Sequence, residues 1–276
     1  MNDDDFFHPE MRKAEHRPAG WMPRIWVTRF LMVDGAACGG RKRWIFGEQV
    51  CIFAMWSKHF REPMRWQTLY EGRWIFGLLI LFTLVSFLIF PWVGILFLGL
   101  ILFSLYFFRD PVREIPDDPL AVVSAADGVV ADIVEQEDGP FEDLPVRIGV
   151  FLSVFNVHVN RSPIEGSVVF TEEKNGKYLD ARHPDASMMN AFRAWVIEGP
   201  ERKVAVRQIT GAIARRIVAW SKPGDSLAKG ERFGMIRFGS RTEVFLPAGT
   251  KVLVAKGDRV EGGRTVIAEF SPKEES

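Results

Sequence analysis

The chain has 276 residues, of which 35 are basic, 35 are acidic and 47% are hydrophobic. This length allows one or two domains with a sizeable core, and the balanced charge argues against a general nucleic-acid binder, which usually carries a basic excess. The two cysteines, Cys38 and Cys51, lack the spacing of metal ligands, so we expect no metal site and no disulfide framework.

Residues 1–63 show no sustained hydrophobic period, and no apolar stretch with a cleavage site follows the start as in a signal peptide. We expect a poorly ordered N-terminal extension, or one that is not translated because the true start is Met55 or Met64. A second interpretation is a basic segment with several tryptophans that lies on a membrane surface.

Residues 64–108 predict an α-helical membrane hairpin. No charged residue occurs from 74 to 108, and an apolar run of about 18 residues or more is typical of a membrane segment. Pro91 lies at its middle and favours a turn, so we expect helices at about 74–90 and 92–108.

Each predicted helix is roughly 25 Å long, a little short of a ~30 Å hydrocarbon core. This leaves open a full two-pass hairpin, a shallow re-entrant wedge, or a buried helix pair in a soluble protein. Both outer ends carry arginines, which places both ends in the cytoplasm if the hairpin is in a membrane. These arginines are Arg61, Arg65, Arg73, Arg109 and Arg113.

Residues 109–276 predict a mainly β (α+β) soluble domain, because short β-rich runs alternate with Gly, Pro and Asp turns. The expected strands, mainly antiparallel, are 121–123, 128–134, 146–151, 166–170, 203–206, 242–245, 251–255 and 266–270. Short helices are expected at 188–196 and 208–220. The stretch KGDRVEGGRTVIAEF (256–270) resembles the turn-and-strand signature of lipoyl and biotinyl carriers, which implies a barrel-sandwich-like fold.

The dipeptide Gly239-Ser240 is either a plain turn before a strand or a bond that the protein cuts in itself. A serine hydroxyl can attack the preceding carbonyl when the bond is strained and a base takes the proton, and glycine there removes the Cβ that would crowd the attack. Elimination would then leave a pyruvoyl group, which can form a Schiff base with an amine. The pair alone decides nothing, because Gly166-Ser167 is a second one.

Several motifs that occur in a fixed order favour self-cleavage over a plain turn. They are FFRDP (107–111), AADGVV (125–130), FLSVFNVHVNRSP (151–163), QITGAIARRIV (208–218) and RFGSRTEVFLP (237–247). With them the chain resembles the phosphatidylserine decarboxylases of the short, type II bacterial and archaeal form over residues 64–270. The resemblance implies pyruvoyl-dependent decarboxylation of phosphatidylserine to phosphatidylethanolamine and CO₂, without a metal or a diffusible cofactor.

The resemblance also implies roles for single residues. Ser240 would become the covalent pyruvoyl cofactor after cleavage behind Gly239, giving a β chain that ends at 239 and an α chain of 240–276. In long-form relatives an Asp and a His resembling a protease triad activate the serine, and Asp127 and His158 match them. Only one of the two long-form histidines has a match, so His158 serves cleavage, decarboxylation or both.

Arginines are candidates for holding the substrate's phosphate or carboxylate, because a guanidinium fork suits both anions. The main candidates are Arg161 and Arg215, with Arg216 and Lys222 as further ones. The alternative for each is a charge that faces solvent or lipid.

The implied partners are phosphatidylserine in the bilayer, the membrane itself and the cleaved α and β chains, alone or as a homo-oligomer, with no nucleic acid. The implied location is the cell membrane, with the catalytic domain on the cytoplasmic side. Two alternatives are a pyruvoyl enzyme for a soluble amino acid and a membrane-anchored barrel-sandwich adaptor or carrier without catalysis. The apolar hairpin argues against the first, and the absence of a carrier lysine argues against the second.

Overall fold

The structure is a computed structural model that describes residues 66–271, except 136–138, 142, 184, 201, 214–215 and 238. The predictions for residues 1–63 and for Arg215 therefore lie outside the described residues.

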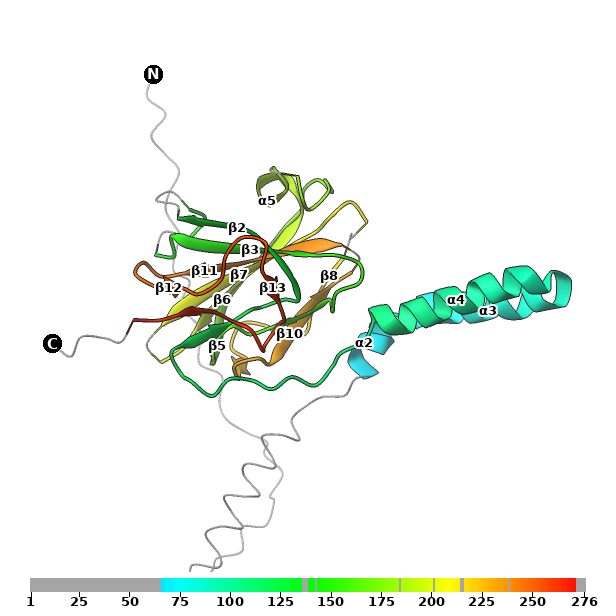
Figure 1. The fold of residues 1–276 in the computed structure, drawn as a ribbon, viewed down its shortest axis with the longest axis horizontal. Coiled ribbons are helices and arrows are strands. Elements are labelled where there is room, and N and C mark those ends of the chain that lie inside the picture. The colour runs from blue at the N-terminus through cyan, green and yellow to red at the C-terminus, as the bar shows by residue number, and fades with distance from the viewer. Residues whose placement is uncertain are drawn as a thin grey trace, which may run out of the picture. The chain divides into compact units, whose positions relative to one another are not determined.

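The apolar stretch forms two helices, α3 (Arg73–Ile89) and α4 (Pro91–Phe107), preceded by the short α2 (Trp66–Glu71). Pro91 is the first residue of α4, where its missing N–H would be unpaired in any case and its fixed φ suits a helix start. The two helices pack side by side (Figure 1), with the rings of Phe82 and Phe97 stacked at 5.5 Å.

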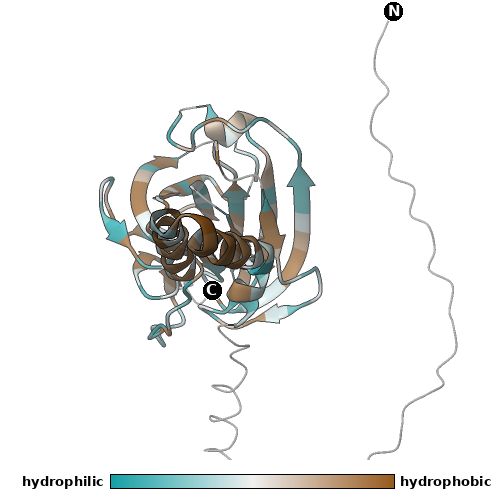
Figure 2. Cartoon of the chain, turned by 90° about the vertical axis from the view of Figure 1, so that its right-hand side faces the viewer, coloured by the Kyte–Doolittle hydropathy of each residue, from teal (hydrophilic) through white to brown (hydrophobic). Residues whose placement is uncertain are grey.

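Most side chains of this hairpin are exposed, and the brown ribbon in Figure 2 shows that its residues are mainly apolar. Thr83 and Ser104 turn their hydroxyls back to the carbonyl oxygens of Leu79 and Leu100, at 2.6 and 2.8 Å. Within residues 66–271 as described, no helix combines the length and the apolar character needed to cross a membrane.

The rest of the described chain is a β domain with one short helix, α5 (Ala186–Met189). Its strands in chain order are β1 (Ala121–Val123), β2 (Gly128–Glu135), β3 (Val146–Leu152), β4 (Val159–Arg161), β5 (Gly166–Lys174), β6 (Phe192–Glu198), β7 (Lys203–Ile209), β8 (Ile217–Ala219), β9 (Ser226–Leu227), β10 (Arg232–Ile236), β11 (Ser240–Leu246), β12 (Lys251–Val252), β13 (Arg259–Val260) and β14 (Val266–Glu269).

The largest sheet has eight strands in the order β13-β2-β3-β11-β7-β6-β5-β9, with neighbours antiparallel throughout, and it curls into half a barrel (Figures 1 and 2). Two smaller sheets, β1-β14-β12 and β4-β10-β8, complete the domain. The predicted mainly antiparallel β domain is confirmed; the closer likeness to barrel-sandwich carriers stays a prediction.

The short helices predicted at 188–196 and 208–220 are wrong over most of their length, although residues 188–189 lie at the end of α5. Residues 192–198 form β6, which pairs along its whole length with β7, and residues 217–219 form β8. On β6, Trp195 and Ile197 alternate into the main core while Val196 packs on the other face with Phe245. This period of two, satisfied by pairing on a sheet, outweighs any local helical preference.

Strand β11 is the central element of the large sheet. It pairs with β3 on one side and β7 on the other, and all of its residues are buried. The fold thereby places the start of β11, residue 240, at a covered end of the sheet.

Candidate active site

The Gly239-Ser240 bond lies where the connection from β10 enters β11. Ser240 pairs with Leu152 on β3, so it already belongs to the sheet. Gly239 has a φ of 62°, a conformation that glycine adopts at little cost and other residues rarely do. The chain therefore turns sharply at the bond that is the candidate for cleavage.

The hydroxyl of Ser240 is buried, and among the described residues it has no hydrogen-bond partner. Buried hydroxyls are normally paired, and an exception often has a catalytic reason. The carbonyl oxygen of Gly239 lies tightly against Gly211, where a Cβ would be only 2.3 Å from it. A nucleophile without a competing bond thus follows directly after a closely held carbonyl, which fits a serine that becomes a pyruvoyl group.

His158 directly precedes β4 and is fully buried. Its Nδ1 lies 2.9 Å from the carbonyl oxygen of Asn156, which can only accept, so Nδ1 carries the proton. Nε2 keeps its lone pair and accepts a 3.3 Å hydrogen bond from the amide of Gly239. Burial lowers the pKa of His158 to about 4, so at neutral pH the ring is uncharged and presents a basic nitrogen at the candidate bond.

A chain of polar side chains connects this site to the core. Thr242, two residues after Ser240 on β11, accepts a 3.0 Å hydrogen bond from Asn160, which is two residues after His158. The side-chain oxygen of Asn160 accepts a 2.8 Å bond from Gln208. His158 lies two residues before Asn160, and Ser240 lies two residues before Thr242, so each reactive residue is on the same side of its extended segment as a residue of this hydrogen bond. This contact therefore fixes the two reactive segments against each other.

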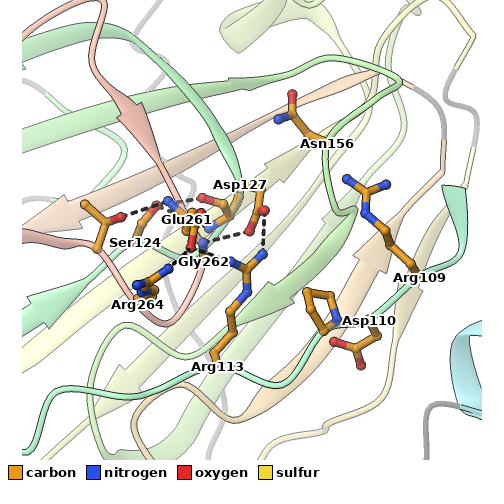
Figure 3. A network of polar contacts seen from close by, with 12 residues as sticks. Arg109, Asp110, Arg113, Ser124, Asp127, Asn156, Glu261, Gly262 and Arg264 are labelled. Carbon is orange, nitrogen blue, oxygen red and sulfur yellow. Dashed lines mark hydrogen bonds and ion pairs between the residues drawn. The ribbon is translucent and has the colours of Figure 1, made fainter. Parts of the chain in front are cut away.

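Asp127 lies in the turn before β2, and both oxygens of its carboxylate have hydrogen-bond partners there (Figure 3). One oxygen accepts a 2.7 Å bond from Arg113, and the other accepts a 2.8 Å bond from the amide of Gly262. Burial raises the pKa of Asp127 above its ordinary value despite these partners. The ring nitrogen of His158 that a triad aspartate would hold faces the carbonyl of Asn156. The structure does not join Asp127 and His158 by a hydrogen bond.

Arg161 is buried within an ion-pair cluster. Its guanidinium donates to Asp110 at 2.8 Å and to the carbonyl oxygen of Gly230 at 3.0 Å. Arg232 pairs with the same Asp110 at 2.6 Å. The Arg161 guanidinium, which was predicted to bind the substrate, thus already forms an ion pair and a hydrogen bond within the protein.

A cavity of about 200 Å³ lies where β7 ends and β8 begins. Thr210, the residue before Gly211, lines it together with Arg216 and Lys174. Within the described ranges, no carboxylate forms an ion pair with Arg216 or Lys174. Glu173, which pairs with Arg193, also lines the cavity, so its wall carries both signs of charge. One of the two cations, Arg216, was among the predicted candidates.

Sequence reasoning missed the supporting residues Asn156, Asn160 and Gly211. In NVHVN, polar residues at 156, 158 and 160 alternate with valines, and this period of two is the signal that would have placed them on one side of an extended segment. No local pattern indicates that Gly211 approaches the carbonyl of Gly239, because the two are distant in sequence.

The chain was compared with known proteins. The family model described as phosphatidylserine decarboxylase matches residues 100–268. A protein named phosphatidylserine decarboxylase proenzyme from Carboxydothermus hydrogenoformans is 49% identical, over 72% of this chain and 95% of its own. Proteins of the same name from Symbiobacterium thermophilum and Ruegeria pomeroyi are each 43% identical, over 72% of this chain and 94% of theirs. By these matches, the chain belongs to the phosphatidylserine decarboxylase family.

Proposed function

We propose that the chain is the precursor of a pyruvoyl-dependent phosphatidylserine decarboxylase that matures by cutting its own Gly239-Ser240 bond. The observation that carries this is the buried hydroxyl of Ser240, which has no partner among the described residues and directly follows Gly239, whose amide bonds a histidine nitrogen that can take a proton. The name proenzyme in the relatives supports a maturation step. The β chain would end at residue 239, and the α chain would be 240–276.

Self-cleavage follows from these positions. Nε2 of His158 takes the hydroxyl proton as Oγ of Ser240 attacks the carbonyl carbon of Gly239. The C–N bond breaks, the nitrogen gains a proton, and an ester joins the two residues. Loss of the Cα proton of residue 240 then breaks its Cβ–Oγ bond, which frees Gly239 as a carboxylate and leaves dehydroalanine. Water displaces the nitrogen as ammonia, and a pyruvoyl group remains at position 240.

The pyruvoyl ketone supplies the electron sink that decarboxylation of an α-amino acid needs. The chain's own residues bind the substrate and move a proton. His158, held neutral by burial, exchanges the proton at the reacting carbon. Arg216 and Lys174 in the cavity, with Arg215, attract the anionic headgroup. The products are phosphatidylethanolamine and CO₂.

We assign supporting roles to the two predicted residues that lie in ion-pair clusters. Asp127 holds Arg113 and the turn at Gly262 next to the start of β2, and Arg161 holds Asp110 beside β4, the strand that follows His158. Both therefore act on the reaction by position and not by proton transfer.

We also propose that the hairpin inserts into the cell membrane, with the β domain on the cytoplasmic side. Its exposed apolar side chains support this, because such a surface is costly in water. The internal hydrogen bonds of Thr83 and Ser104 support it too, since polar groups in lipid need partners within the protein. Confinement to the surface would raise the effective concentration of the lipid headgroup. Binding to phosphatidylserine vesicles, measured by flotation, tests the insertion.

The experiment that tests the proposed function is mass spectrometry of the purified chain under denaturing conditions. We expect a C-terminal fragment of about 4 kDa that begins with a pyruvoyl group at position 240. The Ser240→Ala chain should stay intact and inactive on phosphatidylserine. An active enzyme that is a single uncut chain would overturn the proposal, and an uncut chain that binds lipid without turnover would favour the adaptor alternative.

A further inference from the structure

The end of helix α4 contacts the proposed base directly. Phe107 is the last residue of α4, and its ring centroid lies 4.3 Å from that of His158, with the planes inclined by 37°. Both side chains are fully buried. The imidazole is therefore covered on this side by a residue of the apolar hairpin.

The neighbouring residues hold the turn that precedes His158. The hydroxyl of Tyr106 and the guanidinium of Arg109 both donate to the carbonyl oxygen of Phe155, at 3.3 and 2.7 Å. The ring of Phe103 packs edge-on against that of Phe155 at 6.3 Å. The C-terminal part of α4 and Arg109, two residues beyond it, thus hold Phe155 through three contacts. The carbonyl oxygen of the next residue, Asn156, bonds the imidazole.

We propose that Phe107 is a positioning residue for self-cleavage, which seals His158 from water and keeps its Nε2 directed at Gly239. The inference rests on the proposed role of His158 as the base. It gives the hairpin a second task, because the element proposed to enter lipid also forms one wall of the maturation site.

The charges around His158 are few, which makes the effect of Phe107 measurable. Among the described residues, Arg109 is the charged side chain that acts on the imidazole, and it lowers the pKa. Within the same residues the imidazole also contacts the Phe107 ring, the Asn156 carbonyl and the Gly239 amide, none of which titrates. Removing the ring should therefore change the pKa of His158 mainly by admitting water.

The chain offers a matched control at the next position. Phe108 is as deeply buried as Phe107, but its ring packs on Phe76, at 5.8 Å, against Gly72, and edge-on against the Phe107 ring, at 5.1 Å. Phe107→Leu and Phe108→Leu make the same chemical change at the same helix end. Only the first removes a ring from the histidine.

The first measurement is a titration of His158 by NMR in the uncleavable Ser240→Ala chain in lipid nanodiscs, with its signal identified by its absence in His158→Gln. We expect the pKa to move from about 4 towards the ordinary 6.5 with Phe107→Leu and to stay in place with Phe108→Leu. The same pKa in all three chains, or an equal shift in both variants, would overturn the inference.

The second measurement is the half-time of self-cleavage in a cell-free translation reaction with nanodiscs. Phe107→Leu should slow cleavage roughly tenfold, part of the 10²–10⁴-fold that a placed base contributes, and Phe108→Leu should cleave close to the parent rate. Equal rates for both variants would contradict the positioning role. If His158→Gln itself cleaves at the parent rate, the proposed base fails, and that result is distinct from a failure of Phe107.

Discussion

Two buried polar clusters lie at opposite ends of one short strand, and they differ in how completely they are bonded. At the last residue of β4, Arg161 shares the carboxylate of Asp110 with Arg232 of β10. Before β4, His158 is uncharged, and nearby Ser240 has a hydroxyl that bonds to nothing among the described residues. In this protein the cluster of paired charges stabilises the fold, whereas the proposed reaction takes place where a buried hydroxyl has no hydrogen bond within the part of the chain that the structure describes.

The comparison is tested most strongly at the histidine. His158→Gln keeps a polar side chain of similar length but removes the base, so self-cleavage should slow by roughly 10²–10⁴-fold. The measurement is the rate at which the C-terminal fragment appears after synthesis. His183→Gln is the control, because that ring is exposed and paired only with Asp185, and it should cleave normally. If His158→Gln cleaves at the parent rate, the cluster at His158 is not the site of the proposed reaction.

The ion-pair cluster should respond in stability instead. Asp110→Asn leaves two buried guanidinium groups without their carboxylate, which should lower the free energy of unfolding by about 3–5 kcal/mol. Denaturant unfolding of the uncleavable Ser240→Ala chain measures this. Asp180→Asn breaks an exposed pair with Arg182 and should leave the midpoint nearly unchanged. A stable Asp110→Asn chain would show that the cluster is not a scaffold.

The neutral histidine predicts a pH dependence of stability. The pKa of His158 is lower in the folded chain, about 4, than the ordinary 6.5, so between these values the unfolded chain binds the extra proton. Stability should therefore fall as pH decreases from 6.5 to 4, and the histidine should contribute about 3 kcal/mol of this loss. Ser240→Ala compared with Ser240→Ala/His158→Gln isolates that part. Identical pH profiles in the two chains would contradict the buried neutral ring.

The smallest expected effect distinguishes backbone strain from reactivity. Gly239→Ala forces a side chain onto a φ of 62° and should cost about 1–2 kcal/mol of stability. Gly249→Ala is the matched control, because Gly249 has a φ of 73° and, like Gly239, open space where a Cβ would be. Both variants should lose similar stability, but only Gly239→Ala should slow cleavage. Equal cleavage in the two would show that residue 239 has no special role.

Much of the fold could be predicted from local pattern, but the site only in part. The segments predicted as strands, such as 128–134 and 242–245, are found as β2 and β11 because β-rich runs between turns depend little on distant residues. β6 was missed because its alternation becomes clear only against β7. For the site, the structure places His158 in hydrogen-bond contact with Gly239, the residue before Ser240, and the roles predicted for them stay predictions. Asp127 and Arg161 instead have partners distant in sequence, Gly262 and Gly230, which no local motif indicates.

The central place of β11 has a consequence for the fate of the proposed fragments. Residues 240–246 pair with β3 and residues 241–245 also pair with β7, and the later strands β13 and β14 pair with β2 and β1. A break before residue 240 would thus produce two polypeptides that remain one folded body. The two fragments could separate only if the pairing of β11 with β3 and β7 were broken. Cleavage would therefore be covalently irreversible and would still leave the fold unchanged.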